Sequence, residues 1–289
     1  MSNTLVLKLS PKEQASLKAS LERGTFDHRS VPYAAFSVKG EGVTATQYKS
    51  GKLVVQGKGT EMFVARYLDK QVPAAPKPSP KLGPVDTYVT GSDETGKGDY
   101  FGPLVVVAVR VSPEDRAKLE DSPVTDSKKL TDEACARMAP ALMDRFEHAI
   151  ARLDPPEYNV VHAREKNLNP MLADLHAQAL REIVQDGDRV VVDRFANEKL
   201  VASRMKGLDI ELIQTPRAES LEPAVAAASV IARHTFVEAL AELSASYAVE
   251  LRKGAGSPTD KAARAFVKLH GFDELENVAK LHFKNTQKI

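Results

Sequence analysis

The sequence predicts an α/β protein in two parts: a small α+β domain, and a larger domain whose mixed β-sheet is flanked by helices. Two observations support this prediction. Residues 72–84 contain five prolines in thirteen positions, and such a stretch disfavours helix and sheet hydrogen bonding and behaves as an extended linker. After it, three strand candidates come first and helices then alternate with two more strands, an order typical of mixed sheets covered by helices. We therefore expect domains at residues 1–71 and 85–289.

The first domain begins with an alternating strand over residues 4–9. Pro11 fits the first position of an amphipathic helix that continues to residue 21, because the N–H that proline lacks would have no helical partner there. Three short strands follow within residues 34–58, separated by glycines, and Thr60 can cap a last helix that ends at residue 68. These elements form a small module whose curved sheet can leave one face open.

The second domain contains five strand candidates, each a short apolar or alternating run bounded by turn residues. Helices are expected where the apolar spacing is helical, at residues 163–185, 223–246 and 259–270, and the second of these is rich in alanine. The strands are expected at residues 85–91, 104–111, 147–153, 189–192 and 208–214.

Charge is divided unevenly between the two domains. Residues 1–83 carry 13 Lys and Arg against 6 Asp and Glu, which gives +7, whereas the remainder carries 27 against 33, which gives −6 and accounts for the net charge of +1. A basic small domain beside a mildly acidic larger one is typical of proteins whose small domain holds a polyanion.

The chain has one cysteine, Cys135, which cannot form an intramolecular disulfide, and this is typical of a reducing compartment. No continuous apolar run approaches the roughly 20 residues that span a bilayer. The amino terminus lacks the basic start and long apolar stretch of a secretion signal. We therefore expect a cytoplasmic protein with no membrane partner.

Four carboxylates stand where the predicted structure changes. Asp93 and Glu94 end the first strand of the second domain, and Asp193 ends the fourth. Glu219 lies just before the alanine-rich helix. The carboxyl ends of strands in α/β sheets meet in one crevice, so these side chains can converge. Like charges gathered there would repel unless cations neutralised them, and hard ions such as Mg²⁺ prefer carboxylate oxygens.

Two such ions, roughly 3.5–4 Å apart, can activate a water and stabilise the leaving oxygen in phosphodiester cleavage. We expect Asp93 to bridge them, since it is central to its strand. Glu94 joins the site only if the strand is already turning, because neighbours on a strand point to opposite faces, and Gly96 and Gly98 permit such a turn. The plainer alternative is that these acids are helix caps or solvated turn residues, and their spacing alone does not decide between the two.

The wider sequence around the four acids favours the site. Each acid lies in a segment that matches a motif of one enzyme group, and the segments occur in the order of that group. They are Gly-Ser-Asp-Glu-Thr-Gly-Lys-Gly-Asp-Tyr-Phe-Gly-Pro at 91–103, Asp-Ser-Lys-Lys-Leu at 126–130 as a further motif, Val-Val-Asp-Arg-Phe at 191–195, Arg-Ala-Glu-Ser at 217–220 and Ala-Ala-Ala-Ser-Val-Ile-Ala-Arg at 226–233. Over about residues 85–271 this ordered set resembles the type 2 ribonucleases H.

The resemblance implies a ribonuclease H-like fold. It also implies an endonuclease that hydrolyses the RNA strand of RNA/DNA hybrids by a two-metal-ion mechanism, with Mg²⁺ or Mn²⁺ as cofactor, leaving 5′-phosphate and 3′-hydroxyl ends. The positions of the family's catalytic metal ligands are taken by Asp93, Glu94, Asp193 and Glu219.

Substrate contacts are expected near these ligands. Glycine amides can approach the nucleic-acid chain closely, contacts to the 2′-hydroxyl distinguish RNA from DNA, and cationic or hydroxyl side chains position phosphates and sugars. The residues expected in these roles are Gly96, Lys97, Gly98, Ser127 and Lys128.

Four features are similar to those of the ribonuclease HIII branch rather than those of ribonuclease HII. Glu219 stands where HII usually has aspartate, and Lys97 stands where HII usually has arginine. Residues 253–257 have Ala255 in place of the tyrosine that helps HII sense a ribonucleotide–deoxyribonucleotide junction. The basic first domain resembles the TATA-binding-protein-like substrate domain of HIII in size, charge and strand pattern.

Two alternatives remain beside hybrid cleavage. One is ribonuclease HII-like junction cleavage at single ribonucleotides in DNA, and the other is a non-catalytic hybrid-binding protein. The presence of all four carboxylates favours an enzyme. We expect a monomer, since a heterologous oligomer would obstruct a long duplex groove.

Overall fold

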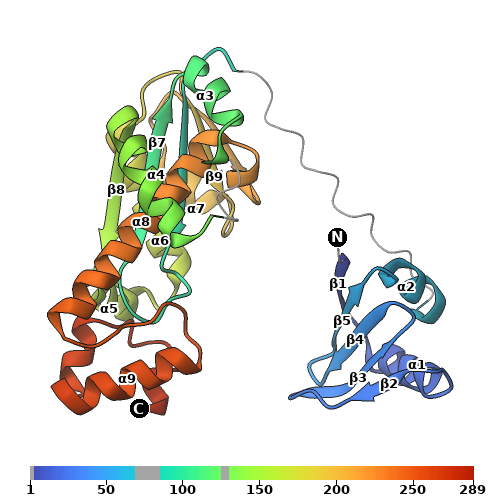
Figure 1. The fold of residues 1–289 in the computed structure, drawn as a ribbon. Helices are drawn as coiled ribbons and strands as arrows, with labels where there is room; N and C mark the ends of the chain where they lie inside the picture. The colour runs from blue at the N-terminus through green and yellow to red at the C-terminus, as the bar shows by residue number, and fades with distance from the viewer. Residues whose placement is uncertain (1–2, 69–84, 125–129) are drawn as a thin grey trace. The chain divides into compact units, whose positions relative to one another are not determined.

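The computed structural model describes residues 3–68, 85–124 and 130–289. Contacts within it divide the chain into two compact units, residues 1–79 and 80–289. Figure 1 shows a β-sheet with helices packed on it in each unit. An α/β architecture with a small α+β unit at the amino terminus, as the sequence predicted, is confirmed.

Some of the predicted features lie outside the described residues. These are the proline-rich linker, residues 72–84, and two expected substrate contacts, Ser127 and Lys128. The other predicted site residues lie on strands, turns and loops that the structure describes.

In the smaller unit the described strands form one antiparallel sheet, and two helices are packed on it. The first helix begins where predicted because Ser10 and Glu13 form a capping box, each side chain accepting a hydrogen bond from the other's backbone N–H. The elements are β1 (Asn3–Lys8), α1 (Pro11–Glu22), β2 (Asp27–Arg29), β3 (Ala34–Gly40), β4 (Val43–Tyr48), β5 (Lys52–Gly57) and α2 (Thr60–Leu68), with sheet order β1-β5-β4-β3-β2. The three-residue β2 was not predicted.

The two faces of this sheet differ in character. Leu7 lies opposite Leu53 in the pairing of β1 with β5, and both pack into the core with the helices. The next pair, Lys8 and Lys52, therefore lies on the other face, since successive side chains on a strand alternate. Both lysines are exposed, and so is Lys39 on β3.

The larger unit contains a second five-stranded sheet among its described residues. Its elements are β6 (Val89–Thr95), β7 (Leu104–Val111), α3 (Pro113–Glu120), α4 (Asp132–Arg145), β8 (Glu147–Leu153), α5 (Pro155–Glu165), α6 (Leu168–Ile183), β9 (Arg189–Asp193), α7 (Lys199–Arg204), β10 (Glu211–Thr215), the 3-10 turn η2 (Ala218–Ser220), α8 (Pro223–Ser246), α9 (Ser257–His270) and the 3-10 turns η3 (Asp273–Asn277) and η4 (Thr286–Lys288). The strand order is β10-β9-β6-β7-β8, parallel among β10, β9 and β6 and antiparallel beyond β6. The predicted mixed sheet is confirmed.

Two predicted elements differ from the structure in a way that affects the site. The first strand was expected at residues 85–91, but β6 runs from Val89 to Thr95, so its acids lie within the strand rather than after it. Residues 163–185, expected to form one helix, contain only the last residues of α5 and all of α6, because Lys166 adopts a left-handed conformation (φ 51°) and Asn167 caps a new helix. Most of α5, residues 155–162, was not predicted. Helices α3, α4 and α7 were not predicted.

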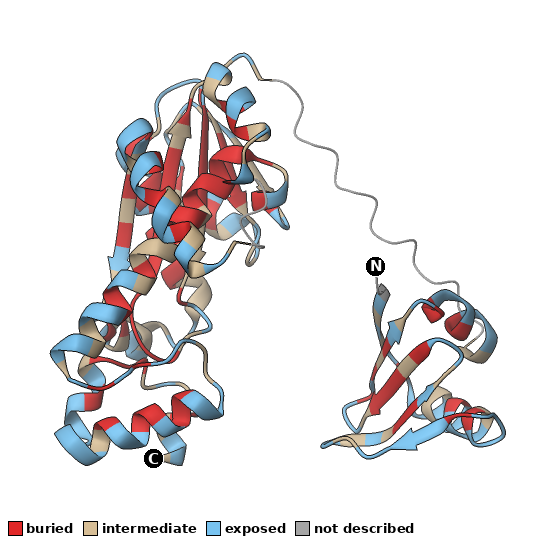
Figure 2. Ribbon diagram, viewed as in Figure 1, coloured by how far each residue is buried: buried red, intermediate tan, exposed pale blue. Residues whose placement is uncertain are grey.

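Helices cover both faces of the sheet. Alternate residues of β7 point to opposite sides: Val105 and Val107 pack in the core under α8, and Leu104 and Val106 pack in the core under α6. Figure 2 shows buried residues along the sheet and along α8. Strands β6 and β9, which carry three of the predicted acids, therefore lie between two apolar layers, and polar side chains there need specific hydrogen-bond partners.

The central helix α8 lies against β6 and β7, with α4 packed against it. Of the helices that the structure describes, it alone is long and apolar enough to span a membrane by length and composition, and 61% of its most apolar window is buried inside this unit. Its backbone reaches β6 at Gly91, where a Cβ would lie 2.4 Å from the Val225 nitrogen. Glycine at this position permits the close approach that brings η2 and α8 beside the acids of β6.

Candidate active site

Asp93 and Glu94 project from β6 toward opposite layers. Asp93 accepts a hydrogen bond from Ser229 of α8, and its Oδ1 also accepts the Glu94 N–H (2.9 Å). Glu94 instead contacts His176 of α6, on the other side of the sheet. The strand alternation that made Glu94 uncertain from the sequence is therefore present, and the strand continues to Thr95 before turning at Gly96.

The carboxylate of Glu94 is held by a chain of polar contacts in the α6 layer. His176 is fully buried; its Nε2 lies 3.3 Å from Glu94 Oε2 and its Nδ1 lies 2.8 Å from Ser92 Oγ. The ring of Phe195 stacks on the imidazole, with centroids 5.1 Å apart. Ser92 and Glu94 share one face of β6, so the imidazole bridges two residues of a single strand and fixes the Glu94 side chain.

Asp193, at the end of β9, lies beside the turn that carries Glu219. Its Oδ1 accepts the Arg217 N–H (2.8 Å), and Arg217 adopts the left-handed conformation (φ 60°) that is rare for a residue with a side chain. Glu219 follows in η2, is buried, and accepts a hydrogen bond from Ser220 Oγ (3.3 Å). The turn thus brings the third and fourth predicted acids together.

The acids influence one another electrostatically. Burial raises the pKa of Asp93, and the negative charges of Glu94 and Asp193 raise it further. Burial likewise raises the pKa of Asp193, together with the charges of Glu219 and Glu94. Although burial alone would raise the pKa of Glu94, its hydrogen bonds and charge interactions with His176 and Lys97 lower it. The four predicted catalytic acids therefore lie within electrostatic range of one another, although Asp93 and Glu94 project toward opposite layers.

Lys97 places a positive charge beside Glu94. Its Nζ donates to Glu94 Oε1, and its side chain is half exposed. Burial would lower its pKa, but the charges of Glu94, Asp93 and Asp193 raise it. A single ammonium compensates only part of the negative charge of this cluster.

The donor set suits a hard divalent cation. In the part of the chain that the structure describes, no three His, Cys, Asp or Glu side chains converge closely enough to enclose an ion as they stand. Mg²⁺ and similar ions are nevertheless commonly held by one or two carboxylates, with water and substrate phosphate completing the shell. Burial, together with the neighbouring negative charges, raises the pKa values of Asp93 and Asp193, and a bound cation would relieve that crowded charge. The residues that could hold such ions are Asp93, Glu94, Asp193 and Glu219.

A glycine loop, residues 96–102, follows the acids of β6. Gly96 has φ 94°, and a Cβ there would lie 2.2 Å from the Pro103 carbonyl oxygen, so only glycine permits this turn. Gly98 is exposed, and a Cβ there would meet nothing within 4 Å. The first glycine therefore serves the fold, while the second leaves open space at the exposed part of the loop.

The segment that replaces the ribonuclease HII tyrosine lies against the glycine loop. The Gly254 N–H donates to Asp99 Oδ1 (2.6 Å), and the Tyr100 N–H donates to the Gly254 carbonyl (3.0 Å). Ala255 is the next residue. The structure thus places the alanine of the 253–257 segment beside a predicted substrate-binding loop.

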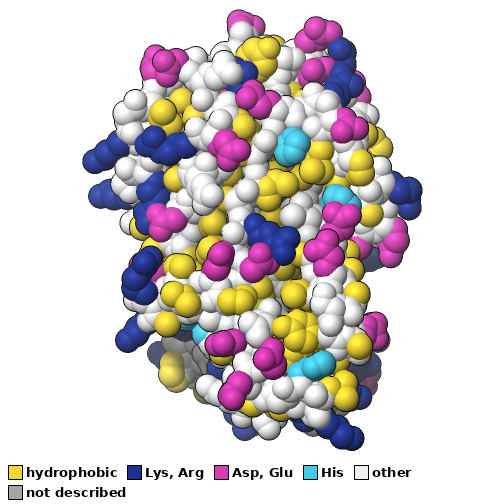
Figure 3. All heavy atoms as spheres, turned by 90° about the vertical axis from the view of Figure 1, so that its left-hand side faces the viewer, with side chains coloured by type: hydrophobic (Ala, Val, Ile, Leu, Met, Phe, Trp, Pro, Cys, Tyr) yellow, Lys and Arg dark blue, Asp and Glu magenta, His cyan; other side chains and the backbone are white. Residues whose placement is uncertain are grey.

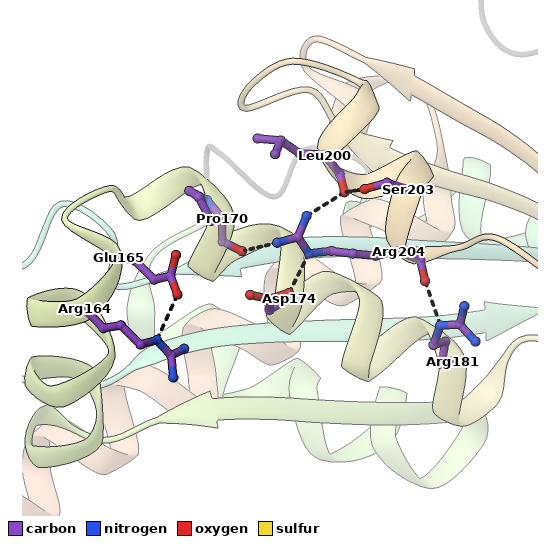
Figure 4. A network of polar contacts seen from close by, with 8 residues as sticks. All are labelled: Arg164, Glu165, Pro170, Asp174, Arg181, Leu200, Ser203 and Arg204. Atoms are coloured by element: carbon purple, nitrogen blue, oxygen red, sulfur yellow. Dashed lines mark hydrogen bonds and ion pairs between the residues drawn. The ribbon is translucent and has the colours of Figure 1, made fainter.

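A polar network fixes the connection that follows Asp193. Arg204 of α7 pairs with Asp174 of α6 and donates to the Pro170 carbonyl, and Arg181 of α6 donates to the Arg204 carbonyl (2.8 Å) (Figure 4). These contacts fasten α7 to α6. They keep Phe195, in the segment between β9 and α7, against His176.

Sequence reasoning did not identify His176, Ser229 or Arg217. One signal for the first was available: a single histidine among the apolar residues of the 163–185 helix, where a polar side chain needs a partner. The other two depend on contacts between segments far apart in the chain. Ser229, for example, lies 136 positions after Asp93.

Comparison with known proteins follows the same division of the chain. A family model described as Ribonuclease HII matches residues 90–286, and one described as a domain of unknown function (DUF3378) matches residues 4–79. A Ribonuclease HIII of Protochlamydia amoebophila is 38% identical over 99% of this chain and 95% of its own length. One of Streptococcus agalactiae is 36% identical, over 99% of this chain and 98% of its own length.

Solved structures agree with the sequence comparison. The crystal structure of Bst-RNase HIII in complex with Mn²⁺ has a TM-score of 0.66 and 33% identity to this chain, and the match covers 99% of this chain and 97% of that one. The predicted ribonuclease H-like fold and the resemblance to ribonuclease HIII are confirmed by these similarities.

Proposed function

The chain belongs to the ribonuclease HII family and is a ribonuclease H, and from this premise we propose that it hydrolyses the RNA strand of RNA/DNA hybrids internally. One observation carries the proposal: acids from β6, β9 and η2, far apart in the sequence, meet within electrostatic range of one another. A strand-end acid that served only as a helix cap or a solvated turn residue would not need such neighbours.

The proposal includes two divalent cations, Mg²⁺ or Mn²⁺, as cofactors. The residues proposed to hold them are Asp93, Glu94, Asp193 and Glu219. Bound ions would supply an activated water and charge stabilisation for the leaving oxygen. The carboxylate donor set and the crowded negative charge support this assignment, and so does the Mn²⁺ complex of the structurally similar Bst-RNase HIII. The expected products carry 5′-phosphate and 3′-hydroxyl ends, which is typical of the family.

The protein's own groups orient these carboxylates. His176 and Lys97 hold the two oxygens of Glu94, and the Arg217 N–H holds one oxygen of Asp193. A carboxylate that is already oriented loses less conformational freedom when it binds an ion, and such supporting contacts commonly strengthen metal binding. Lys97 and Gly98, both exposed in the glycine loop, are proposed to contact the RNA strand.

Binding of the duplex is proposed to involve the basic amino-terminal unit. Its helix-free sheet face carries the exposed Lys8 and Lys52, and residues 1–83 hold a surplus of seven positive charges. On the face of the molecule in Figure 3, by contrast, acidic and basic side chains are interspersed. A polyanion is attracted by a surplus of positive charge, so the amino-terminal unit is the better candidate.

The proposed activity is tested with two labelled duplexes, an RNA/DNA hybrid and a DNA duplex with a single ribonucleotide, each incubated with Mg²⁺ or Mn²⁺. We expect cuts at many sites in the hybrid and little cutting at the single ribonucleotide. Ala255 lies where ribonuclease HII has its junction-sensing tyrosine, and a methyl group offers no ring or hydroxyl for that contact. Efficient cutting at the lone ribonucleotide would establish HII-like specificity, and no cutting of either duplex would leave a binding protein.

Replacing Gly98 by Ala is expected to reduce hybrid cleavage without destabilising the fold. Beyond its two chain neighbours the new methyl group meets no protein atom within 4 Å, so the fold can accept it. It would stand where the RNA strand is proposed to pass, and a displacement of about 1 Å at a reacting group can reduce the rate about 10²-fold. Steady-state kinetics and thermal unfolding of the same sample measure the two effects. Normal cleavage by the variant would show that the RNA strand does not pass close to Gly98.

Gly96→Ala is the matched comparison for that variant. Its methyl group would collide with the Pro103 carbonyl, and its φ of 94° is unfavourable for alanine. We expect a loss of more than about 1 kcal/mol in unfolding free energy. The two variants together separate a glycine that the turn requires from one that the substrate requires.

A further inference from the structure

Lys280, near the carboxyl terminus, is buried without any exposed surface. Its Nζ donates to two backbone carbonyls of the glycine loop, those of Gly102 (2.6 Å) and Asp99 (3.0 Å). The ammonium also lies over the ring of Tyr158, 5.6 Å from the centroid. A side chain from the end of the chain thus points into the interior of a loop that follows the catalytic acids.

Burial of an ammonium group in this way is unfavourable. It lowers the pKa of Lys280 to about 7, although the charge of Asp99 opposes this effect. Lysine is rarely buried completely, and its two partners here are neutral carbonyls of one loop. Since an apolar side chain would fill the space without this penalty, the carbonyl contacts are the property that lysine adds.

Backbone contacts place Lys280 on the loop in a fixed register. The Lys280 N–H donates to the Tyr100 carbonyl (2.8 Å), and the Gly102 N–H donates to the Val278 carbonyl (3.0 Å). Phe101 pairs with Ala279 between them as an isolated antiparallel bridge. The carboxyl-terminal segment therefore forms a short strand-like contact along one side of the glycine loop.

The remaining side of the loop is fixed through Asp99. Its carbonyl accepts from Lys280, while its carboxylate accepts the Gly254 N–H (2.6 Å). The loop residues from 99 to 102 are thus held from two directions, and Lys97 and Gly98 are left exposed. A loop that is fixed at its base and open at its tip is suited to receive a ligand without prior rearrangement.

We propose that Lys280 is a positioning residue, whose buried ammonium clamps the carbonyls of Asp99 and Gly102 and so holds the glycine loop ready for the RNA strand. The inference rests on the proposed function, because it assigns Lys280 to the binding of that substrate. Among the described residues, the Lys280 side chain contacts the base of the loop and Tyr158, and it does not contact the four acids or the exposed tip of the loop. Its effect is on the population of the competent loop conformation.

Replacing Lys280 by Met keeps the length of the side chain but removes its donors. If the competent loop conformation falls to between about 1% and 10% of molecules, the apparent affinity for the hybrid falls about 10- to 100-fold. Bound substrate would restore the loop, so KM is expected to rise by this factor while kcat changes little. Lys284→Met is the matched control, since Lys284 is an exposed lysine of the same segment.

Two further measurements on the full chain separate positioning from general damage. Hydrogen–deuterium exchange in Lys280→Met is expected to increase in peptides covering residues 96–103 and 278–282, and not in those covering β7. Mn²⁺ binding, followed by electron paramagnetic resonance, should match that of the unaltered chain. A merely structural role would lower kcat, metal binding and the unfolding temperature together.

The outcomes distinguish the two levels of the proposal. No hybrid cleavage by the unaltered chain would sink the proposed function itself. Normal cleavage by the unaltered chain, with an unchanged KM and unchanged loop exchange in Lys280→Met, would overturn the role of Lys280 alone. If the methionine variant does not fold, Lys280→Gln, which retains one shorter donor group, carries the same test and should show a smaller rise in KM.

Discussion

Asp93→Asn is expected to abolish hybrid cleavage while hybrid binding is retained. The substitution removes the negative charge at the centre of the acid cluster, and an amide oxygen is a weaker ligand for a hard cation than a carboxylate. Loss of one group that stabilises charge in a transition state commonly lowers kcat about 10²–10³-fold, and loss of a proposed metal ligand should reach at least that range. Cleavage kinetics with Mg²⁺ and filter binding without metal measure the two properties.

The same variant is expected to unfold at a higher temperature in metal-free buffer. Burial and Glu94 raise the pKa of Asp93 in the folded protein, so the ionised carboxylate opposes folding at neutral pH. Because the pKa of this carboxyl is higher in the folded protein than in the unfolded chain, the free energy of unfolding falls as the pH rises from the unfolded pKa through the folded one. Asparagine has no such charge, and its advantage should grow over that pH range.

Asp86→Asn is the control for both effects, because Asp86 is an exposed acid close to the same strand. It should change neither cleavage nor the unfolding temperature. Undiminished cleavage by Asp93→Asn would remove Asp93 from the mechanism. An unfolding temperature at or below that of the unaltered chain would show that the cluster does not carry the electrostatic strain described above.

Deleting residues 1–80 is expected mainly to weaken hybrid binding and to reduce its dependence on salt. The deleted part holds the basic surplus and forms its own compact unit, so the catalytic unit loses cationic contacts but keeps its acids. The slope of log affinity against log salt should become shallower by about 0.9 for each phosphate that this unit neutralises. Binding isotherms over a series of salt concentrations provide the measurement.

Point substitutions locate the effect within the amino-terminal unit. Lys8→Gln combined with Lys52→Gln changes the helix-free face of the sheet, whereas Lys12→Gln changes exposed charge on α1. The first pair is expected to reproduce part of the loss in salt dependence, and the second substitution is expected to leave it unchanged. A dissociation constant that does not change on deletion, at every salt concentration, would rule out a binding role for this unit.

Much of the architecture follows from local sequence patterns. The strands at residues 104–111 and 147–153 and the helix at 223–246 have the bounds predicted for them. Proline marks the start of two of them, since Pro103 precedes the first strand and Pro223 opens the helix. Errors occurred where local signals compete. The 163–185 segment has continuous helical spacing, yet a left-handed Lys166 and the Asn167 cap divide it.

The acid cluster is only partly determined by the sequence. Ordered motifs identified Asp93, Glu94, Asp193 and Glu219 as candidates, because the residue types and their spacing lie within short segments. Strand alternation indicated that Glu94 would point away from Asp93, and the structure has that arrangement. What the alternation could not indicate is the partner on the far side, because His176 is contributed by a helix 82 residues later in the chain.

The sequence by itself determined the class of enzyme, the order in which the four acids follow the strands, and the glycines near these acids, because these are properties of short segments. Tertiary structure alone decided how those segments are held: Arg217 on Asp193, His176 on Glu94, and Lys280 on the glycine loop. Such contacts join residues that are separated by up to 181 positions, as between Lys280 and Asp99. These contacts depend on how the apolar layers pack, and no local pattern of residues encodes a contact across so long a stretch of sequence.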